Sequence, residues 1–315
     1  MLQLKVYTDI NEFYDDTYDL FMCHEAQNVI PLGNIIIGKE GKDKTEWRDP
    51  KNWFMATVNN NGIILLIALM TPPKGLTLYA KNNTINEDSI KCLINGMEKH
   101  IVTGVMSTKE MAFHFADAYC NSKNMTYKTK EDLRLHELSA VNPEIPQIGK
   151  LRLAEESDMS FLPYWLEAFQ VCMNKNGITM NEPQDEMSYL HIISQRNRYI
   201  LEHEGIPVSM AAITRKMQTC CNIAGVYTPP YFRGRGYASS CVAKVSQIIL
   251  DQGFAKSILT TDLSNPTSNK IYQKIGYRPI CDSVMLNFIN SNNTSPPSAS
   301  SQNQCLPRTG QLSNY

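Results

Sequence analysis

The stretch that decides the fold reads Ile223-Ala224-Gly225-Val226-Tyr227-Thr228-Pro229-Pro230-Tyr231-Phe232-Arg233-Gly234-Arg235-Gly236-Tyr237-Ala238. Its apolar start predicts a buried strand, its two prolines a loop, and its glycines the entry to a helix. Glycine lets the backbone approach a ligand, and the unpaired N–H groups of a first helical turn attract an anion. Residues 234–238 therefore predict a pyrophosphate site, and Arg233 and Arg235 add positive charge at its mouth.

Two other glycine-loop chemistries fit this stretch poorly. A phosphoryl-transfer loop needs Lys-Ser/Thr after its last glycine, where this chain has Tyr237 and Ala238. A dinucleotide fingerprint could use Ser239 as its third small residue and Asp262 as its acidic residue. However, the strands expected before the loop form an antiparallel meander, without the repeated strand–helix units of that fold.

The pattern that does fit is Arg/Gln-x-x-Gly-x-Gly/Ala, matched by Arg233 to Ala238, together with the later segment Asp262 to Tyr277. With these motifs the chain resembles the GNAT superfamily of N-acetyltransferases, from about Lys150 to Ile289. The resemblance implies a GNAT fold, a central mixed β-sheet flanked by helices. The cofactor-binding residues that it implies are Val226, Tyr227 and Thr228 along the pantetheine arm, Arg233, Gly234, Arg235, Gly236, Tyr237 and Ala238 at the pyrophosphate, and Asn265 and Asn269 on the last helix.

Tyr272 is the candidate catalytic acid. It follows Asn265 and Asn269 at helical spacings of four and three, so the three side chains are expected on one face toward the cofactor. A phenol of pKa about 10 can protonate a thiolate whose thiol has a pKa of about 8.5, at an uphill cost of about 2 kcal/mol.

The sequence does not identify the general base. A lysine-like amine of pKa about 10.4 is neutral to about one part in 2,500 at pH 7, a handicap of about 4.6 kcal/mol. Residues 218–228 contain no Asp or Glu that could offset it. The remaining candidates are Glu167, Glu186, His191, Glu202, His203 and relay through water. Cys220 and Cys221 are adjacent on a strand, and we expect buried thiols on opposite faces rather than a nucleophile.

Composition sets the class of protein. The chain has 315 residues, 43% of them hydrophobic, and a formal net charge of −1, which disfavours a nucleic-acid partner. Its nine cysteines include no C-x-x-C pair, which favours reduced thiols and a cytoplasmic location. The start lacks the pattern of a signal peptide, and the longest apolar run, Ile63 to Met70, is too short to span a bilayer.

The predicted organisation has four parts. Residues 1–140 form an α+β domain, accessory or a degenerate GNAT-like copy without a coenzyme loop, residues 141–149 a linker, residues 150–289 the acetyl-CoA-binding α+β domain, and residues 290–315 a disordered tail. Within the tail, Leu306 to Gly310 matches a wall-sorting pattern, but no hydrophobic segment follows it, so we take the match as chance.

The expected elements of the first half are a hairpin of 53–58 and 63–70, whose second strand is central, a helix opened by a capping box at Ser107 and Glu110, and a strand over 127–138. In the second half we expect strands at 150–153, 199–203, 208–214, 219–227, 257–261 and 284–288. The expected helices there are one capped by Ser157 or Asp158, one near 186–195, one ended by Gly253, and one capped by Asn265 and ended by Gly276. Both halves contain a polar-turn hairpin, a hint that they are related.

The sequence therefore predicts an N-acetyltransferase that moves an acetyl group from acetyl-CoA to a primary amine by direct attack in a ternary complex. The acceptor is a small amine or a peptide amine, and polyamines, aminoglycosides, amino acids and peptide N-termini all stay open. We expect no metal, nucleic-acid or membrane partner, and a homodimer is compatible with the sequence. The alternative is an acyl-CoA-binding sensor that has no transferase turnover.

Overall fold

The computed structural model describes residues 1–41, 48–173 and 185–290. The predicted tail, apart from Asn290, lies outside the described residues, as do Cys305 and the sorting-like pattern Leu306 to Gly310.

The two halves of the chain repeat the same order of elements. Apart from short 3-10 turns, each half begins with one strand, two helices and three strands. A helix, a strand, a second helix and a final strand follow. The first half contains β1 (Leu2–Tyr7), α1 (Ile10–Met22), α2 (Val29–Glu40), β2 (Phe54–Asn60), β3 (Ile63–Met70), β4 (Leu76–Tyr79), α3 (Glu87–Gly96), β5 (Gly104–Thr108), α4 (Lys109–Lys123) and β6 (Met125–Leu138). The second half contains β7 (Lys150–Leu153), α5 (Leu162–Met173), α6 (Glu186–Ser194), β8 (Arg198–His203), β9 (Ile206–Lys216), β10 (Cys220–Tyr227), α7 (Tyr237–Asp251), β11 (Lys256–Asp262), α8 (Pro266–Ile275) and β12 (Arg278–Asn290).

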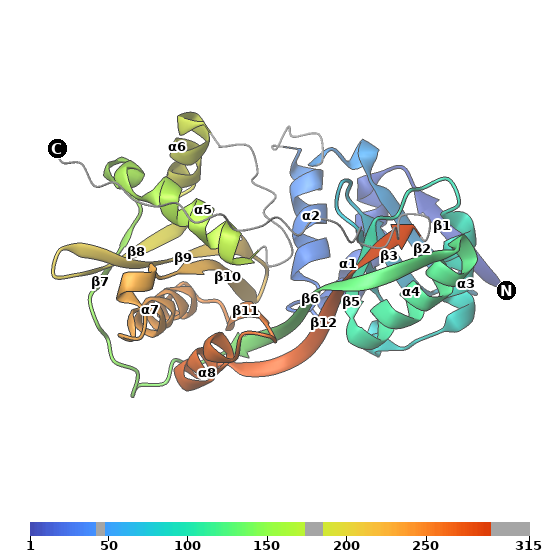
Figure 1. Cartoon of the computed structure of the whole chain (residues 1–315). Coiled ribbons are helices and arrows are strands. Elements are labelled where there is room, and N and C mark those ends of the chain that lie inside the picture. Colours follow the sequence, from blue (N-terminus) through green and yellow to red (C-terminus); the bar gives the residue numbers. More distant parts are fainter. Residues whose placement is uncertain (42–47, 174–184, 291–315) are drawn as a thin grey trace, which may run out of the picture.

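All twelve strands form one mixed sheet, in the order β1-β2-β3-β4-β5-β12-β6-β11-β10-β9-β8-β7. The pairs β4–β5 and β10–β11 are parallel, and the remaining pairs are antiparallel. The last strand of each half lies beside the fifth strand of the other half, because β6 pairs with β11 and β12 pairs with β5. We call β6 and β12 the exchanged strands, and Figure 1 shows them running between the two lobes. The predicted α+β class with a mixed sheet is confirmed.

Helices cover both faces of the sheet in each lobe, which explains the apolar pattern of the inner strands. In β3, Leu66 and Ala68 pack in the core beneath α3 and α4, whereas Ile67 and Leu69 pack in the core beneath α1. The prediction of a central strand over 63–70 is therefore confirmed. In the second lobe, α5 and α6 lie on one face and α7 and α8 on the other (Figure 1).

The first half also reaches onto the sheet of the second half. Val29, at the start of α2, packs in a cluster with Cys220 of β10 and Ile258 of β11. Just before it, the Glu25 carboxylate accepts hydrogen bonds from the backbone N–H of Gln218 at 2.6 Å and from the Thr219 hydroxyl. These bonds hold the turn between β9 and β10, so the first half helps to position β10.

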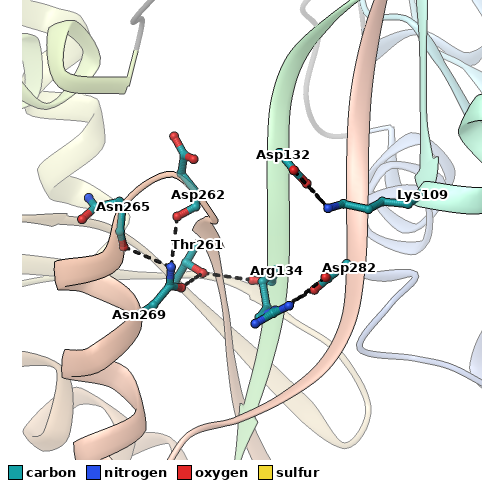
Figure 2. Close-up of polar contacts among 8 residues, drawn as sticks. All are labelled: Lys109, Asp132, Arg134, Thr261, Asp262, Asn265, Asn269 and Asp282. Carbon is teal, nitrogen blue, oxygen red and sulfur yellow. Dashed lines mark hydrogen bonds and ion pairs between the residues drawn. The ribbon is translucent and has the colours of Figure 1, made fainter.

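Charged pairs join the exchanged strands to their surroundings (Figure 2). Arg134 of β6 donates two hydrogen bonds to Asp282 of β12, at 2.6 and 2.8 Å. Lys109 at the start of α4 lies 2.7 Å from the Asp132 carboxylate of β6. Each such partly exposed pair contributes little to the free energy of unfolding, about 1 kcal/mol or less. The pairs therefore act mainly on the register in which the exchanged strands align.

Two local expectations were wrong. The capping box fails because Ser107 belongs to β5 and its hydroxyl donates to the Leu78 carbonyl oxygen, while Thr108 occupies the N-cap of α4. Neither Ser157 nor Asp158 caps α5, because Asp158 closes a 3-10 turn with an N-cap at Glu155 and pairs with Arg152.

The strand expected at 284–288 does more than close the second half. In the structure β12 runs from Arg278 to Asn290, and its later part pairs with β5 of the first half.

The described helices and cysteines also bear on the class of protein. None of the described helices is long and apolar enough to cross a membrane. The eight described cysteines are free thiols.

We predict that Gly104→Ala destabilises the fold because a Cβ at this position in β5 would overlap the Leu286 carbonyl oxygen of β12. Overpacking against backbone should cost about 3 kcal/mol in the free energy of unfolding. The control is Gly62→Ala, where a Cβ meets open space and only the positive φ of 82° is strained, at about 1 kcal/mol. Urea unfolding measures both, and equal losses would contradict the close pairing of β5 with β12.

Candidate functional site

An opening in the sheet lies at the end of β10. The strand pairs with β11 only from Cys220 to Ile223, and its pairing with β9 slips between Ala224 and Tyr227. Gly225 and Val226 lie in this bulge without a ladder partner among the described strands, and Gly225 takes a φ of 62°. Beyond Ile223 the edge of β10 is not paired with β11, so an extended ligand could add there as a further strand.

The end of β10 is fixed from β9. The Ser209 hydroxyl donates to the Tyr227 carbonyl oxygen at 3.1 Å and lies 2.9 Å from the Thr228 hydroxyl. Ser209 was missed in the sequence, although a fully buried hydroxyl within an otherwise apolar strand is the signal that could have found it.

The glycine loop after β10 has the geometry that suits an anion. Gly234 and Gly236 have φ values of 77° and 83°, a region that disfavours other residues. Gly236 is the N-cap of α7 and has no side chain to satisfy the first N–H groups of the helix. These groups carry the positive end of the helix dipole, so they suit a phosphate.

Arginines flank this loop, as expected. Arg233 donates from Nε to the Thr228 carbonyl oxygen at 2.9 Å, which ties the two ends of the loop together. The Arg235 guanidinium lies 4.9 Å from the ring centre of Tyr231. Both arginines are exposed, so their remaining N–H groups can meet an anion at the start of α7.

The segment between β6 and β7 forms one wall of the loop. The Ser240 hydroxyl of α7 donates to the Ile148 carbonyl oxygen at 2.8 Å. The Ile148 side chain lies 3.4 Å from the point where a Cβ on Gly236 would sit. Sequence reasoning missed both residues because their contact is long-range.

Asn265 and Asn269 serve the structure of α8. Asn265 caps the helix by accepting from the Ser268 N–H at 3.2 Å. The Asn269 amide accepts from the Thr261 hydroxyl at 2.6 Å and donates to the carbonyl oxygens of Asp262 and Asn265 (Figure 2). With these bonds the amides tie α8 to β11, and their role at a cofactor stays a prediction.

Tyr272 belongs to α8 and packs against the core cluster beneath α7. Its ring centre is 6.0 Å from that of Tyr277. Burial, with smaller contributions from Tyr277 and Cys241, raises the pKa of Tyr272 well above the usual value of a phenol. Its hydroxyl has no hydrogen-bond partner within the described ranges. Tyr272 is therefore protonated at neutral pH and free to donate, although it is a weaker acid than an exposed tyrosine.

Two base candidates lie away from the opening. Glu202 is held by Arg152 at 2.8 Å on the outer strands of the sheet. The His203 ring lies 5.3 Å from that of Tyr237, at the phosphate end of the site.

The other candidates lie on α5 and α6. Glu167 accepts from the Tyr189 hydroxyl at 3.0 Å, and Glu186 and His191 are exposed. The geometry singles out none of the candidates as the base.

The two adjacent cysteines of β10 point to opposite faces, as predicted. Cys220 packs beneath α2, whereas Cys221 packs in the core beneath α7. Burial raises the pKa of both thiols, that of Cys221 to about 11, so neither is a thiolate at neutral pH. The described residues contain no group of three or more His, Cys, Asp or Glu side chains arranged to hold a metal ion.

In the first half, the helix that corresponds to α7 begins with a side-chain cap and acidic residues. There α3 follows β4, and its N-cap Asn86 accepts from the Ser89 N–H through its side chain. Glu87 and Asp88 stand in the first turn, where their charges stabilise the helix but repel a phosphate. This supports the prediction that the first half binds no coenzyme.

Comparison with known proteins supports the C-terminal assignment. Residues 162–277 match the model of the acetyltransferase (GNAT) family. A search of curated proteins finds no match.

Solved structures share the fold over most of the chain. An acetyltransferase of the GNAT family from Colwellia psychrerythraea is 13% identical, covers 91% of this chain and 99% of its own, and has a TM-score of 0.55. A GCN5-related N-acetyltransferase from Sphaerobacter thermophilus is 13% identical, with coverages of 90% and 94% and a TM-score of 0.58. A tandem GNAT protein from the clavulanic acid biosynthesis pathway is 10% identical, with coverages of 91% and 98% and a TM-score of 0.53. The family model thus identifies a GNAT domain at residues 162–277, and the N-terminal half also aligns with GNAT structures, consistent with a tandem arrangement.

We predict that Gly236→Ala weakens acetyl-CoA binding at least about 10-fold, because a methyl group at a φ of 83° distorts the anion-binding turn. Isothermal titration calorimetry measures the change in affinity. The matched control is Gly253→Ala at the other end of α7, where φ is 91° and a Cβ meets open space. Equal affinities of the two variants would contradict the loop assignment.

Proposed function

We propose that this protein is an N-acetyltransferase that moves an acetyl group from acetyl-CoA to a primary amine by direct attack in a ternary complex. The family match and the fold support acyl transfer in general. The observation that carries the specific proposal is the opening at Gly225 and Val226 beside the side-chain-free N-cap at Gly236. Together they offer one site for an extended arm and one for its phosphates.

Each part of acetyl-CoA has a matching part of the site. The pyrophosphate would bind the first N–H groups of α7, with Arg233 and Arg235 beside them. The pantetheine arm would run along Val226 as an added strand. The thioester would then reach the opening between β10 and β11, where a backbone N–H near Val226 or Tyr227 can stabilise the oxyanion.

Acyl transfer forms one bond and breaks one. The neutral amine nitrogen attacks the thioester carbonyl carbon, the C–S bond breaks, and the leaving thiolate takes a proton. Tyr272 is the proposed donor of this proton, because it is protonated and its hydroxyl is uncommitted. Because β10 carries no carboxylate, the amine would lose its proton to water or to one of the base candidates on neighbouring elements, and a proton from solvent would restore Tyr272.

The missing carboxylate also favours a second candidate, a sensor that binds acyl-CoA without transfer. The free hydroxyl of Tyr272 supports the enzyme over the sensor.

We expect acetyl-CoA to release its thiol in the presence of an amine panel of polyamines, aminoglycosides, amino acids and peptides. Ellman's reagent follows the thiol, and mass spectrometry identifies the acetylated acceptor. Hydrolysis without an amine is the control. Tight acetyl-CoA binding without thiol release from any acceptor would overturn the enzyme and support the sensor.

We predict that Tyr272→Phe lowers kcat about 10²- to 10⁴-fold, the usual contribution of a general acid, while affinity for acetyl-CoA changes little. Equal turnover of the two proteins would exclude Tyr272 as the acid. Because burial raises the pKa of Tyr272, deprotonation occurs above the usual phenol value and the acid stays active as pH rises. We therefore expect no alkaline fall in the wild-type kcat profile below about pH 10, and a fall centred below pH 9 would assign the acid elsewhere.

A further inference from the structure

A guanidinium that has no counterion in the described part of the chain lies directly at the opening of the sheet. Arg198 begins β8, and its Nη1 atom is 3.1 Å from the point where a Cβ on Gly225 would sit. Its Nε atom is fully buried and has no hydrogen-bond partner among the described residues. Within residues 1–41, 48–173 and 185–290 the side chain donates only to the Met210 sulfur, at 3.8 Å.

The sheet is built to let this side chain reach across it. Arg198 pairs with Ala212 of β9, and Ala212 pairs with Ala224 of β10. Side chains of directly paired residues share a face, and two methyl groups leave room for a long side chain to lie over both strands. The guanidinium thus ends under the bulge instead of in solvent.

The face on which Arg198 lies is the one away from α7. Ile200, two residues on, belongs to the core cluster of Leu162 and Trp165 on α5. Side chains two residues apart in a strand share a face, so Arg198 also faces α5 and α6. Because α7 and the glycine loop occupy the other face, an amine would approach the thioester from the side of Arg198.

The environment of Arg198 differs from that of another partly buried arginine in this lobe. Arg152, on the neighbouring strand β7, pairs with Asp158 at 2.7 Å and Glu202 at 2.8 Å. Burial lowers the pKa of Arg198 to about 10, and in the described part of the chain no acidic neighbour opposes this shift. A buried cation without an anion is costly, so a fold that retains one favours a ligand that supplies the anion.

A second arginine continues the positive region toward α2. Arg215 of β9 pairs in register with Asn222, which lies two residues before Ala224 on the same face of β10. Its Cδ atom is 3.0 Å from the point where a Cβ on Gly33 of α2 would sit. Among the described residues the acceptor face therefore carries at least two guanidinium groups, one at the opening and one beneath α2.

We propose that Arg198 binds the carboxylate of the acceptor, so that the acceptor is an amino acid or another amine carrying a carboxyl group. The inference rests on the proposed function and narrows its substrate class. The planar fork of arginine suits a carboxylate, which it can bind through two parallel hydrogen bonds. A fixed positive charge also disfavours the ammonium form of a nearby amine, which helps at a site without a strand carboxylate.

The test compares matched acceptors on wild-type protein: amino acids, their amides, and the decarboxylated amines with the same side chains, for example phenylalanine, phenylalaninamide and phenylethylamine. We expect kcat/KM for the preferred amino acid to exceed that of its neutral partners by about 10- to 100-fold, as a charge-assisted hydrogen-bonded pair predicts. Equal values for acids and their neutral partners would overturn the inference while leaving the transferase intact.

Variants test the residue itself. Arg198→Gln should raise the KM of the amino acid and remove the preference for it, with the KM of acetyl-CoA unchanged, and Arg198→Lys should restore part of the preference. The matched control is Arg278→Gln, which removes an exposed arginine of the same half and should change neither value. A preference retained in Arg198→Gln, or an equal loss on neutral amines, would overturn the assignment.

Two further measurements distinguish misfolding of the variant and failure of the proposed function from failure of the carboxylate assignment. Thermal unfolding checks that Arg198→Gln folds, and if it does not, the matched acceptors on wild-type protein still decide. If no amine releases thiol, the proposed function fails. Calorimetry of the amino-acid panel against the protein with acetyl-CoA bound then tests the inference alone, because carboxylate binding should disappear in Arg198→Gln.

Discussion

The pairing of β6 with β11 and of β12 with β5 is the constraint on which the rest of the structure depends. Without its exchanged strand, each half would expose the edge of its fifth strand, an unpaired row of N–H and C=O groups that invites aggregation. The exchange has a functional consequence, because β11 is one border of the opening at Val226. The first half holds that border through β6, and it holds the other border through Glu25 at the turn before β10. It thus sets the geometry of a site to which it contributes no phosphate-binding group.

The two copies of one element order differ in the first turn of one helix. In the second half the helix after the fourth strand begins at Gly236, whose positive φ and missing side chain leave its N–H groups to a ligand. In the first half the corresponding helix satisfies its own start with Asn86, and Glu87 and Asp88 place negative charge there. Function here is set by local sequence on a shared scaffold, not by the scaffold itself.

Local signals made much of this structure predictable. Capping by Asn265 and termination by Gly276 bound α8, and the unbroken apolar run of β3 marks a central strand. The exchange of β6 and β12 could not be predicted from the sequence. Hydrophobic periodicity shows that a segment such as β6 is a strand, but it does not show which strand it pairs with. The capping box failed for the same reason, since Ser107 finds its partner in β4, far away in sequence. Arg198 was not singled out, because an arginine at the start of a strand resembles a surface residue until the tertiary fold buries it.

In the proposed mechanism the two faces of the sheet bring a polyanionic cofactor and a charged acceptor to one reaction centre. The phosphates would bind at the start of α7, on one face, where Gly234, Gly236 and the flanking arginines supply N–H groups and positive charge. The other face presents Arg198 at the opening and Arg215 beneath α2, so we expect it to repel polycationic amines and to attract an acceptor with an anionic group. The reacting groups, a thioester and a neutral amine, would then meet at the bulge in β10 without carrying net charge to it. In the proposed arrangement electrostatics would select the acceptor, and a catalytic carboxylate on β10 would not be required to hold it.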